Sequence, residues 1–162
     1  MNTKVNLAGV ELKNPVMTAS GTFGSGMEYS EFVDLNRLGA VVTKGIASVP
    51  WPGNPTPRVT EVYGGMLNAI GLQGPGVDLF IERDIPFLKK YDTKIIVNVC
   101  GKTKEDYVDV VERLAETDVD MLENQHLLSQ RKRGRHRLRP GSEMRGGHHK
   151  GRKESGKNSL SS

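Results

Sequence analysis

The sequence has few of the features that mark secreted, membrane or zinc-binding proteins. Its 162 residues include one cysteine, Cys100, which excludes a disulfide framework and a cysteine-based zinc cluster. It has no run of roughly 18 apolar residues, so no segment is predicted to span a membrane. It does not begin with a basic and then apolar signal segment, and we therefore expect a cytoplasmic protein. With 36% hydrophobic residues, the length suffices for one core.

The net charge of +4 is the sum of two unlike parts. Residues 1–123 contain 12 Lys and Arg against 17 Asp and Glu, whereas residues 124–162 contain 11 against 2. The second part holds all four histidines and has no Ala, Val, Ile, Thr, Asp or aromatic residue. A basic chain with so few apolar side chains cannot bury enough surface to offset its ordering entropy. We therefore predict a folded part over 1–123 and a disordered basic tail over 124–162.

Strand and helix signals alternate along residues 1–123. Apolar runs bounded by turn residues predict strands at 5–7, 10–12, 15–17, 40–43, 94–99 and 119–123. Helical spacing predicts a short helix capped by Ser30 and ended by Gly39, a helix over 77–91 interrupted by Pro86, and one capped by Thr103. Strands and helices repeated in this way favour an α/β fold, with a parallel sheet and helices outside it.

Polar or glycine residues follow the ends of three predicted strands, namely Ser20-Gly21, Lys44-Gly45 and Asn98. The carboxyl edge of a parallel sheet binds ligands both in barrels and in open α/β sheets. No G-x-G-x-x-G follows the first strand, so a barrel is preferred over a dinucleotide-binding open sheet. Residues 46–67 form a long excursion with four prolines and a glycine pair, and an excursion of this length usually serves function.

Four stretches of the sequence carry a resemblance to a known family: NPVMTASGTFGSG (14–26), LGAVVTKGI (38–46), PWPGNPTPRVTEVYGGMLNAIGLQGPG (50–76) and VNVCGKTKEDYVDVVERL (97–114). Together they resemble the amino-terminal half of class 1 dihydroorotate dehydrogenase, and GNPTPRV resembles its NAD-linked B type. The resemblance implies half of a (β/α)₈ TIM barrel, about four strands, in an FMN enzyme that oxidises dihydroorotate to orotate in pyrimidine biosynthesis. It also implies a partner subunit with FAD and an iron-sulfur cluster that passes electrons to NAD.

The same resemblance implies binding roles for particular residues. The residues implied to contact FMN are Ser20, Gly21, Lys44, Gly45 and Asn98. The residues implied to contact the substrate are Lys44, Asn68, Ala69, Ile70, Gly71 and Leu72. A lysine suits a carboxylate or a reduced flavin, and asparagine offers a donor and an acceptor to a ring with alternating C=O and N–H. Without the motifs, these residues would be interpreted as ordinary turn, cap or strand-end residues.

The family's catalytic segment does not follow Glu123 in this chain. The resemblance implies a continuation into Ile-Asn-Ile-Ser-Cys-Pro-Asn, whose cysteine abstracts the substrate's proton. Cys100 lies in VNVCG instead, and we interpret it as a small buried hydrophobic residue. One permitted codon choice for residues 124–139 reads INISCPNVKEGGIAF once its first base is removed. We therefore hypothesise one inserted base after the Glu123 codon, and expect the chain to be inactive and to lack the main FMN phosphate loops.

Two other functions remain open at this point. The basic runs at 131–139 and 150–153 could bind nucleic acid phosphates, although the tail lacks aromatic residues for stacking on bases. The chain could also be a natural non-catalytic scaffold or interaction fragment. The pair His148-His149 has no further ligands near it in sequence, and we interpret it as accidental rather than as a metal site.

Overall fold

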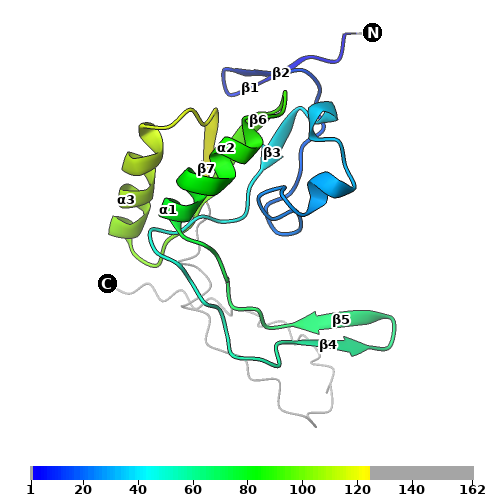
Figure 1. Ribbon diagram of the computed structural model, residues 1–162, viewed down its shortest axis with the longest axis vertical. Coiled ribbons are helices and arrows are strands. Elements are labelled where there is room, and N and C mark those ends of the chain that lie inside the picture. The colour runs from blue at the N-terminus through cyan, green and yellow to red at the C-terminus, as the bar shows by residue number, and fades with distance from the viewer. Residues whose placement is uncertain (1, 125–162) are drawn as a thin grey trace, which may run out of the picture.

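The computed structural model describes residues 2–124 (Figure 1). The hypotheses that concern residues 125–162 lie outside the described residues. These are the disordered tail, the shifted reading frame, the nucleic acid site and the histidine pair.

A parallel sheet forms the centre of the described part. Its order is β3 (Ala40–Val42), β6 (Lys94–Val99) and β7 (Met121–Asn124), and Met17 adds a parallel bridge to Ala40 beside β3. These four strand positions are neighbours in chain order, without the reversal of order that defines a doubly wound sheet. The predicted parallel α/β fold is confirmed, and the last strand begins two residues later than predicted.

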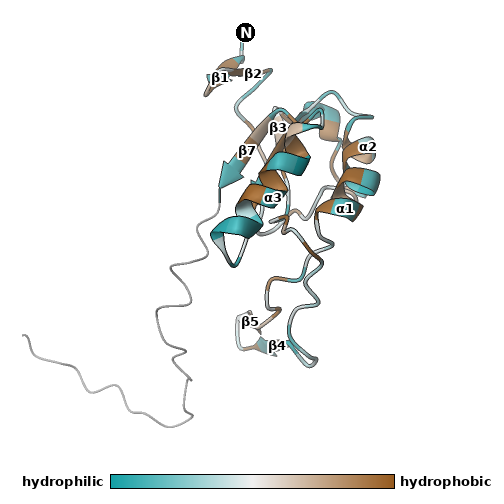
Figure 2. Cartoon of the chain, turned by 90° about the vertical axis from the view of Figure 1, so that its left-hand side faces the viewer, coloured by the Kyte–Doolittle hydropathy of each residue, from teal (hydrophilic) through white to brown (hydrophobic). Residues whose placement is uncertain are grey.

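Helices cover one face of this sheet (Figures 1 and 2). One helical segment comprises α1 (Val77–Leu79), η3 (Phe80–Asp84) and α2 (Ile85–Leu88), and the other is α3 (Lys104–Ala115). The main apolar cluster joins strand residues to helix residues, among them Val41, Ile95, Val97, Val99, Phe80, Leu88, Val110 and Leu114. Burying these side chains provides the largest favourable contribution to folding, at about 1.5–3 kcal/mol for each large residue.

The predicted interruption at Pro86 takes the form of a π-helical turn. The turn η3 covers Phe80–Asp84, and Pro86 lies in the first turn of α2. Proline lacks an N–H, and its ring collides with the preceding helical turn. The wider turn fits the ring without ending the helix, so the chain stays helical from Val77 to Leu88.

The predicted cap of α3 is confirmed. Thr103 Oγ1 accepts from Asp106 N at 3.2 Å, and the Asp106 carboxylate accepts from Thr103 N at 3.0 Å, which makes a capping box. Asp106 also accepts from Lys102 N at 2.8 Å, and this hydrogen bond is the largest cause of a lowered pKa for the Asp106 carboxyl. The cap fixes where the helix begins relative to the end of β6.

A hairpin covers the other face of the sheet at its amino end. Strands β1 (Val5–Leu7) and β2 (Val10–Leu12) pair antiparallel around Ala8 and Gly9, which have φ values of 48° and 93°. This confirms the predicted hairpin. Leu12 joins Ala40 and Ile96 in a second buried cluster on that face.

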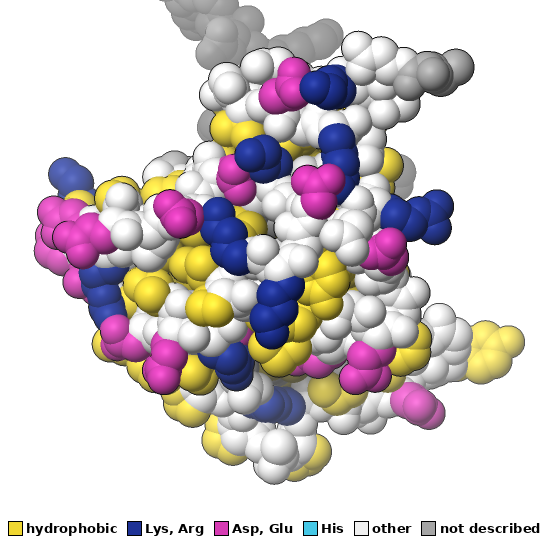
Figure 3. Space-filling model, turned by 45° about the horizontal axis from the view of Figure 1, so that its top comes forward, with side chains coloured by type: hydrophobic (Ala, Val, Ile, Leu, Met, Phe, Trp, Pro, Cys, Tyr) yellow, Lys and Arg dark blue, Asp and Glu magenta, His cyan; other side chains and the backbone are white. Residues whose placement is uncertain are grey.

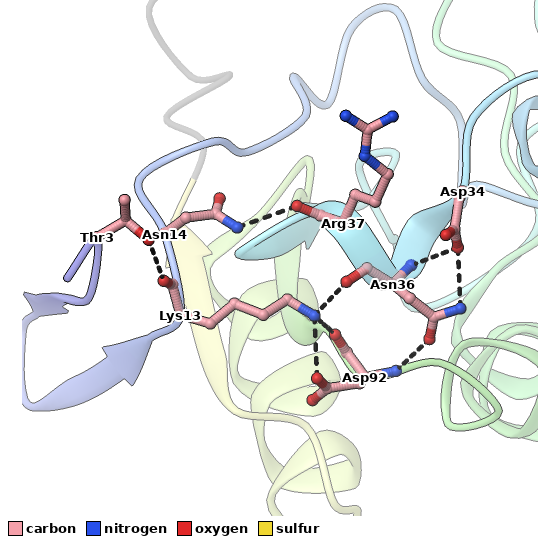
Figure 4. A network of polar contacts seen from close by, with 7 residues as sticks. All are labelled: Thr3, Lys13, Asn14, Asp34, Asn36, Arg37 and Asp92. Carbon is pink, nitrogen blue, oxygen red and sulfur yellow. Dashed lines mark hydrogen bonds and ion pairs between the residues drawn. The ribbon is translucent and has the colours of Figure 1, made fainter. Parts of the chain in front are cut away.

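Polar contacts connect the segment after this hairpin to two other segments at the amino-terminal end of the sheet (Figure 4). Lys13 Nζ donates to the carbonyl oxygens of Asn36 and Asp92, and lies 3.1 Å from Asp92 Oδ2. Asp92 N in turn donates to Asn36 Oδ1 at 2.9 Å. One lysine therefore joins three segments that are distant in sequence.

Two predictions in the first forty residues are wrong. The segment 15–17 is not a buried strand, because Val16 is 56% and Met17 is 42% exposed at the edge of the described sheet. The helix predicted after Ser30 is replaced by two short 3₁₀ turns, η1 (Tyr29–Glu31) and η2 (Leu35–Arg37). Asp34 caps the start of η2, because its short carboxylate accepts from Asn36 N at 3.0 Å.

Gly39 has a different role from the predicted helix stop. Its N–H donates to Val16 O at 2.9 Å, and a Cβ at this position would lie 2.0 Å from Asn14 O. Glycine therefore permits the close approach of two backbone segments beside β3.

We predict that Gly39→Ala lowers the free energy of unfolding by about 1–3 kcal/mol, because the backbone must move to accommodate the new methyl group. Urea denaturation followed by circular dichroism measures the loss. The control is Gly65→Ala, where the nearest atom to a Cβ would be Val62 Cγ2 at 3.9 Å. Equal stability of the two variants would contradict the packing described for Gly39.

Candidate functional site

Polar contacts join the carboxyl ends of the four strand positions. Thr18 Oγ1 donates to Val42 O at 3.1 Å and accepts from Val42 N at 2.8 Å. Asn98 N donates to Thr43 Oγ1 at 3.4 Å, and Asn98 Nδ2 donates to Glu123 Oε2 at 2.7 Å. The contacts run across the whole edge, so the predicted strand-end residue Asn98 lies in a connected polar row.

Asn98 holds an unusual position in this row. Its side chain is 3% exposed, and Oδ1 is buried without a hydrogen-bond partner among the described residues. An unsatisfied buried acceptor costs about 1–3 kcal/mol. A ligand that presents an N–H group to Oδ1 would remove this cost.

Lys44 follows the end of β3 by two residues, and its backbone N–H donates to Gly24 O at 2.8 Å. It lines an open hollow of about 350 Å³ together with Glu28, Gln73, Arg83 and Asp84. The buried Asp84 pairs through Oδ1 with Arg83 Nε at 2.6 Å, and this hydrogen bond is the largest cause of a raised pKa for Arg83. The hollow thus contains charges of both signs.

Ser20 and Gly21 lie in a turn after the first strand position. Thr22 N and Phe23 N donate to Ala19 O at 3.1 and 3.2 Å, which closes the turn. A Cβ on Gly21 would meet nothing within 4 Å among the described residues. The turn leaves room for a ligand, but neither residue lines the hollow beside Lys44.

The excursion after Lys44 contains a two-stranded ribbon. Strands β4 (Val59–Val62) and β5 (Gly65–Asn68) form an antiparallel hairpin that projects from the α/β body (Figure 1). Trp51 and Gly74 exchange two backbone hydrogen bonds of 3.0 Å at its base. The Gly64-Gly65 pair is the sequence signal that could have predicted this hairpin.

The segment from Asn68 to Leu72 lies on this ribbon. Asn54 N donates to Ile70 O at 2.9 Å, and Asn54 Nδ2 donates to Ala69 O at 2.7 Å. Gly71 has φ of 80°, and a Cβ on it would lie 2.7 Å from Asn54 Cγ. These residues are exposed and do not line the hollow, so the structure does not bring them to Lys44.

Gly74 is not required by a close approach of the backbone. A Cβ on Gly74 would lie 3.5 Å from Gly45 O, which is ordinary van der Waals contact. The backbone pairing of Gly74 with Trp51 therefore does not depend on the absence of a Cβ.

Cys100 is buried, as predicted. It is 4% exposed and packs with Ala47 and Trp51. Burial raises the pKa of its thiol to about 11, and the charge of Lys44 opposes this shift only in part. The thiol is therefore protonated at neutral pH and cannot serve there as a base.

Three polar residues of the row were missed by sequence reasoning. They are Thr18, Thr43 and Glu123. Thr43 and Glu123 were interpreted as parts of strands, and Thr18 was assigned to no element. The signal that could have found them is a polar side chain at or beside the end of each apolar run.

The described part of the chain lacks the features of a metal site and of a membrane-spanning helix. Residues 2–124 hold no group of three or more His, Cys, Asp or Glu placed to bind a metal ion. No helix within this range is long and apolar enough to cross a membrane. On the face drawn in Figure 3, Lys and Arg side chains are interspersed with Asp and Glu side chains, so that face presents no continuous basic stripe.

The parallel sheet in chain order, with polar side chains along its carboxyl edge, defines an α/β protein of the kind that binds ligands at that edge. The family model described as dihydroorotate dehydrogenase matches residues 2–124. The chain therefore belongs to the dihydroorotate dehydrogenase family.

The names of individual relatives are more specific than the description of the family model. The chain is 75% identical over 123 residues to a protein of Lachnoclostridium phytofermentans named dihydroorotate dehydrogenase B (NAD(+)), catalytic subunit, and 71% identical to one of that name from Alkaliphilus metalliredigens. Each match covers 76% of this chain and 41% of the relative, so the chain spans about two fifths of the relatives' length. The resemblance to the B type is confirmed.

A solved structure also matches the fold. It is DHODH from Eimeria tenella in complex with ferulenol, with a TM-score of 0.59 and 21% identity. The match covers 76% of this chain and 36% of that chain.

We predict that Cys100 reacts slowly with iodoacetamide at about pH 8 in the folded chain, because the thiolate is the reactive form. The rate should rise with pH up to about 11, whereas in urea the thiol should regain its ordinary pKa of 9.0. Since folding raises this pKa, stability should fall as pH rises between those two values. Equal alkylation rates in the folded and unfolded chain at about pH 8 would contradict the burial of Cys100.

Proposed function

We propose that residues 2–124 are the amino-terminal part of an FMN-binding (β/α)₈ barrel that oxidises dihydroorotate to orotate in pyrimidine biosynthesis. The observation that carries the proposal is the polar row at the carboxyl edge, in which Asn98 keeps a buried acceptor without a partner among the described residues. The 75% identity to a B-type catalytic subunit supports it. The strand order, which follows the chain, suits a barrel.

The residues at this edge fit a flavin and a pyrimidine. Both rings carry N–H groups that could donate to Asn98 Oδ1, which is otherwise unsatisfied among the described residues. Lys44 supplies a positive charge for the substrate carboxylate or for a reduced flavin. Ser20 and Gly21 lie in a turn, and glycine at positions 21 and 45 has no side chain to keep a planar ring away from the backbone. Bound FMN would supply the two-electron acceptor for the oxidation.

The roles of Asn68, Ala69, Ile70, Gly71 and Leu72 require the ribbon to face the bound substrate. Asn54 holds this segment in place through Ala69 and Ile70, so the ribbon could present Asn68 as one unit. We propose that these residues contact the pyrimidine ring from the ribbon, while Lys44 binds the carboxylate from the sheet.

We propose in addition that this chain by itself does not turn over dihydroorotate. The only cysteine of the sequence is Cys100. Its pKa is raised to about 11, so the thiol is protonated at neutral pH and cannot abstract a proton there. The family match ends at residue 124, where the expected catalytic segment should begin. One inserted base after the Glu123 codon accounts for the lack of a catalytic cysteine and for the end of the family match at residue 124.

The B-type relatives also bear on partners and location. Their names describe a catalytic subunit. We propose that an intact form of this protein works in the cytoplasm with a second subunit, which carries FAD and an iron-sulfur cluster and delivers electrons to NAD.

The test compares this chain with a frame-corrected gene from which one base after the Glu123 codon is deleted. The corrected protein should purify with bound FMN and oxidise dihydroorotate, whereas the present chain should do neither. Resequencing of the codons around Glu123 shows whether the base belongs to the gene. Turnover by the present chain would contradict the proposed inactivity, and an inactive corrected protein would contradict the proposed reaction.

In the corrected protein we predict that Lys44→Ala lowers kcat/KM for dihydroorotate by roughly 10- to 100-fold, since one charged hydrogen bond contributes about 1.5–3 kcal/mol. Steady-state kinetics with a dye as electron acceptor measures the loss. Lys104→Ala, at the exposed start of α3, is the matched control and should keep full activity. A Lys44→Ala variant as active as that control would exclude a binding role for Lys44.

A further inference from the structure

The side-chain amide of Asn98 has two possible orientations in a fixed backbone. The backbone is held on both sides, because Asn98 N donates to Thr43 Oγ1 at 3.4 Å and Asn98 O accepts from Ile46 N at 2.7 Å. The terminal torsion of asparagine is roughly two-fold, and its two settings exchange the oxygen and the nitrogen of the amide. Which end faces a ligand therefore depends on the groups that the amide contacts.

Glu123 selects one of these orientations. Asn98 and Glu123 are register partners on the neighbouring strands β6 and β7, and Asn98 Nδ2 donates to Glu123 Oε2 at 2.7 Å. A carboxylate accepts hydrogen bonds and has none to donate. The reversed amide would place Asn98 Oδ1 against Glu123 Oε2, as two acceptors without a proton between them. Glu123 therefore disfavours the reversed orientation.

The pair leaves one end of the amide unused. A buried amide with a purely structural role normally has partners at both ends. Asn98 is 3% exposed, and its Oδ1 has no partner among the described residues. Glu123 itself is exposed, so the pair extends from the interior to the surface of the carboxyl edge. This arrangement suits a residue that prepares Asn98 for a ligand.

We propose that Glu123 is a positioning residue, which holds the amide of Asn98 so that only its acceptor faces the ligand. The site then selects a ring that carries an N–H group at this point over the same ring with an N-methyl group there. This inference rests on the proposed function, since it takes a flavin or a pyrimidine as the ligand.

Three side chains at position 123 separate the two orientations of the amide. Glutamate only accepts, glutamine both accepts and donates, and lysine only donates. Glu123→Gln therefore permits both orientations, whereas Glu123→Lys requires the reversed one, in which Asn98 Nδ2 faces the ligand. The matched controls are Glu112→Gln and Glu112→Lys, which make the same substitutions at an exposed position of α3 outside the polar row.

The orientation is measured in the full chain without any ligand. Nitrogen-edited NMR resolves the two protons on Asn98 Nδ2, which are assigned by through-bond correlation to the Asn98 backbone. Glu123→Lys should shift both signals, because these protons lose their carboxylate acceptor, whereas Glu112→Lys should leave them in place. Identical Asn98 signals in the two lysine variants would overturn the positioning role.

The selectivity is measured in the frame-corrected protein with methylated ligands. One arm compares the dissociation constants of FMN and of FMN methylated at its ring N–H, after reconstitution of the apoprotein. The other compares kcat/KM for dihydroorotate and for its N-methyl derivatives. With Glu123 in place, methylation should cost about tenfold or more in one arm, because it removes one hydrogen bond to Asn98 Oδ1. That arm identifies the ring that Asn98 contacts.

The variants should reduce this methylation penalty. With Glu123→Lys the penalty should be about tenfold smaller, because the N–H then has no acceptor to lose. Glu123→Gln should give an intermediate penalty. Since glutamine keeps the shape of glutamate, this variant decides the question if the lysine variant does not fold. Both Glu112 controls should keep the full penalty.

Failure of this inference can be told from failure of the proposed function. If the frame-corrected protein is active but the methylation penalty is the same with Glu123, with either Glu123 variant and with the Glu112 controls, the positioning role is wrong and the function stands. An inactive frame-corrected protein would overturn the proposed function, whatever the NMR result.

Discussion

Side chains along the central strands alternate between the two faces of the sheet. This alternation determines which residues enter the apolar core under the helices and which lie on the face of the polar row. In β6, Ile95, Val97 and Val99 pack into the apolar cluster under the helices, while Ile96 faces the other side with Leu12. Asn98 follows Ile96 by two residues and must therefore lie on that same face. A shift of register by one residue would place the amide in the helical core and an aliphatic side chain in the polar row.

The helical layer holds this register in place. The capping box at Thr103 starts α3 directly after the end of β6, so Val110 and Leu114 meet the strand side chains. The π-helical turn lets the other helix pass Pro86 without leaving the sheet. The polar edge is thus positioned by apolar packing on the opposite face of the sheet.

How much could be predicted depended on whether a signal was local. The hairpin at Val5–Leu12, the strands β3 and β6 and the cap at Thr103 each follow from short patterns, and all are confirmed. The wrong predictions concern residues whose role depends on competition between neighbouring capping residues or on contacts between segments distant in sequence. Asp34 caps a second short turn within the segment where Ser30 was expected to begin one helix. Gly39 permits a close approach to Asn14, which lies 25 residues away in sequence. Exposure of Val16 depends on what lies beside it in the sheet, which no local pattern contains.

The candidate site shows the same limit. Lys44 and Asn98 could be placed at one edge from the sequence, because the carboxyl ends of parallel strands share an edge. Their partners could not, since the bond from Asn98 to Glu123 spans 25 residues and depends on the exact register of β6 against β7. That bond uses the Nδ2 donor of Asn98 and leaves its Oδ1 acceptor unsatisfied among the described residues. Glu123 thereby fixes the orientation of the amide, and the acceptor that is left over is the group that we propose to receive an N–H from a ligand.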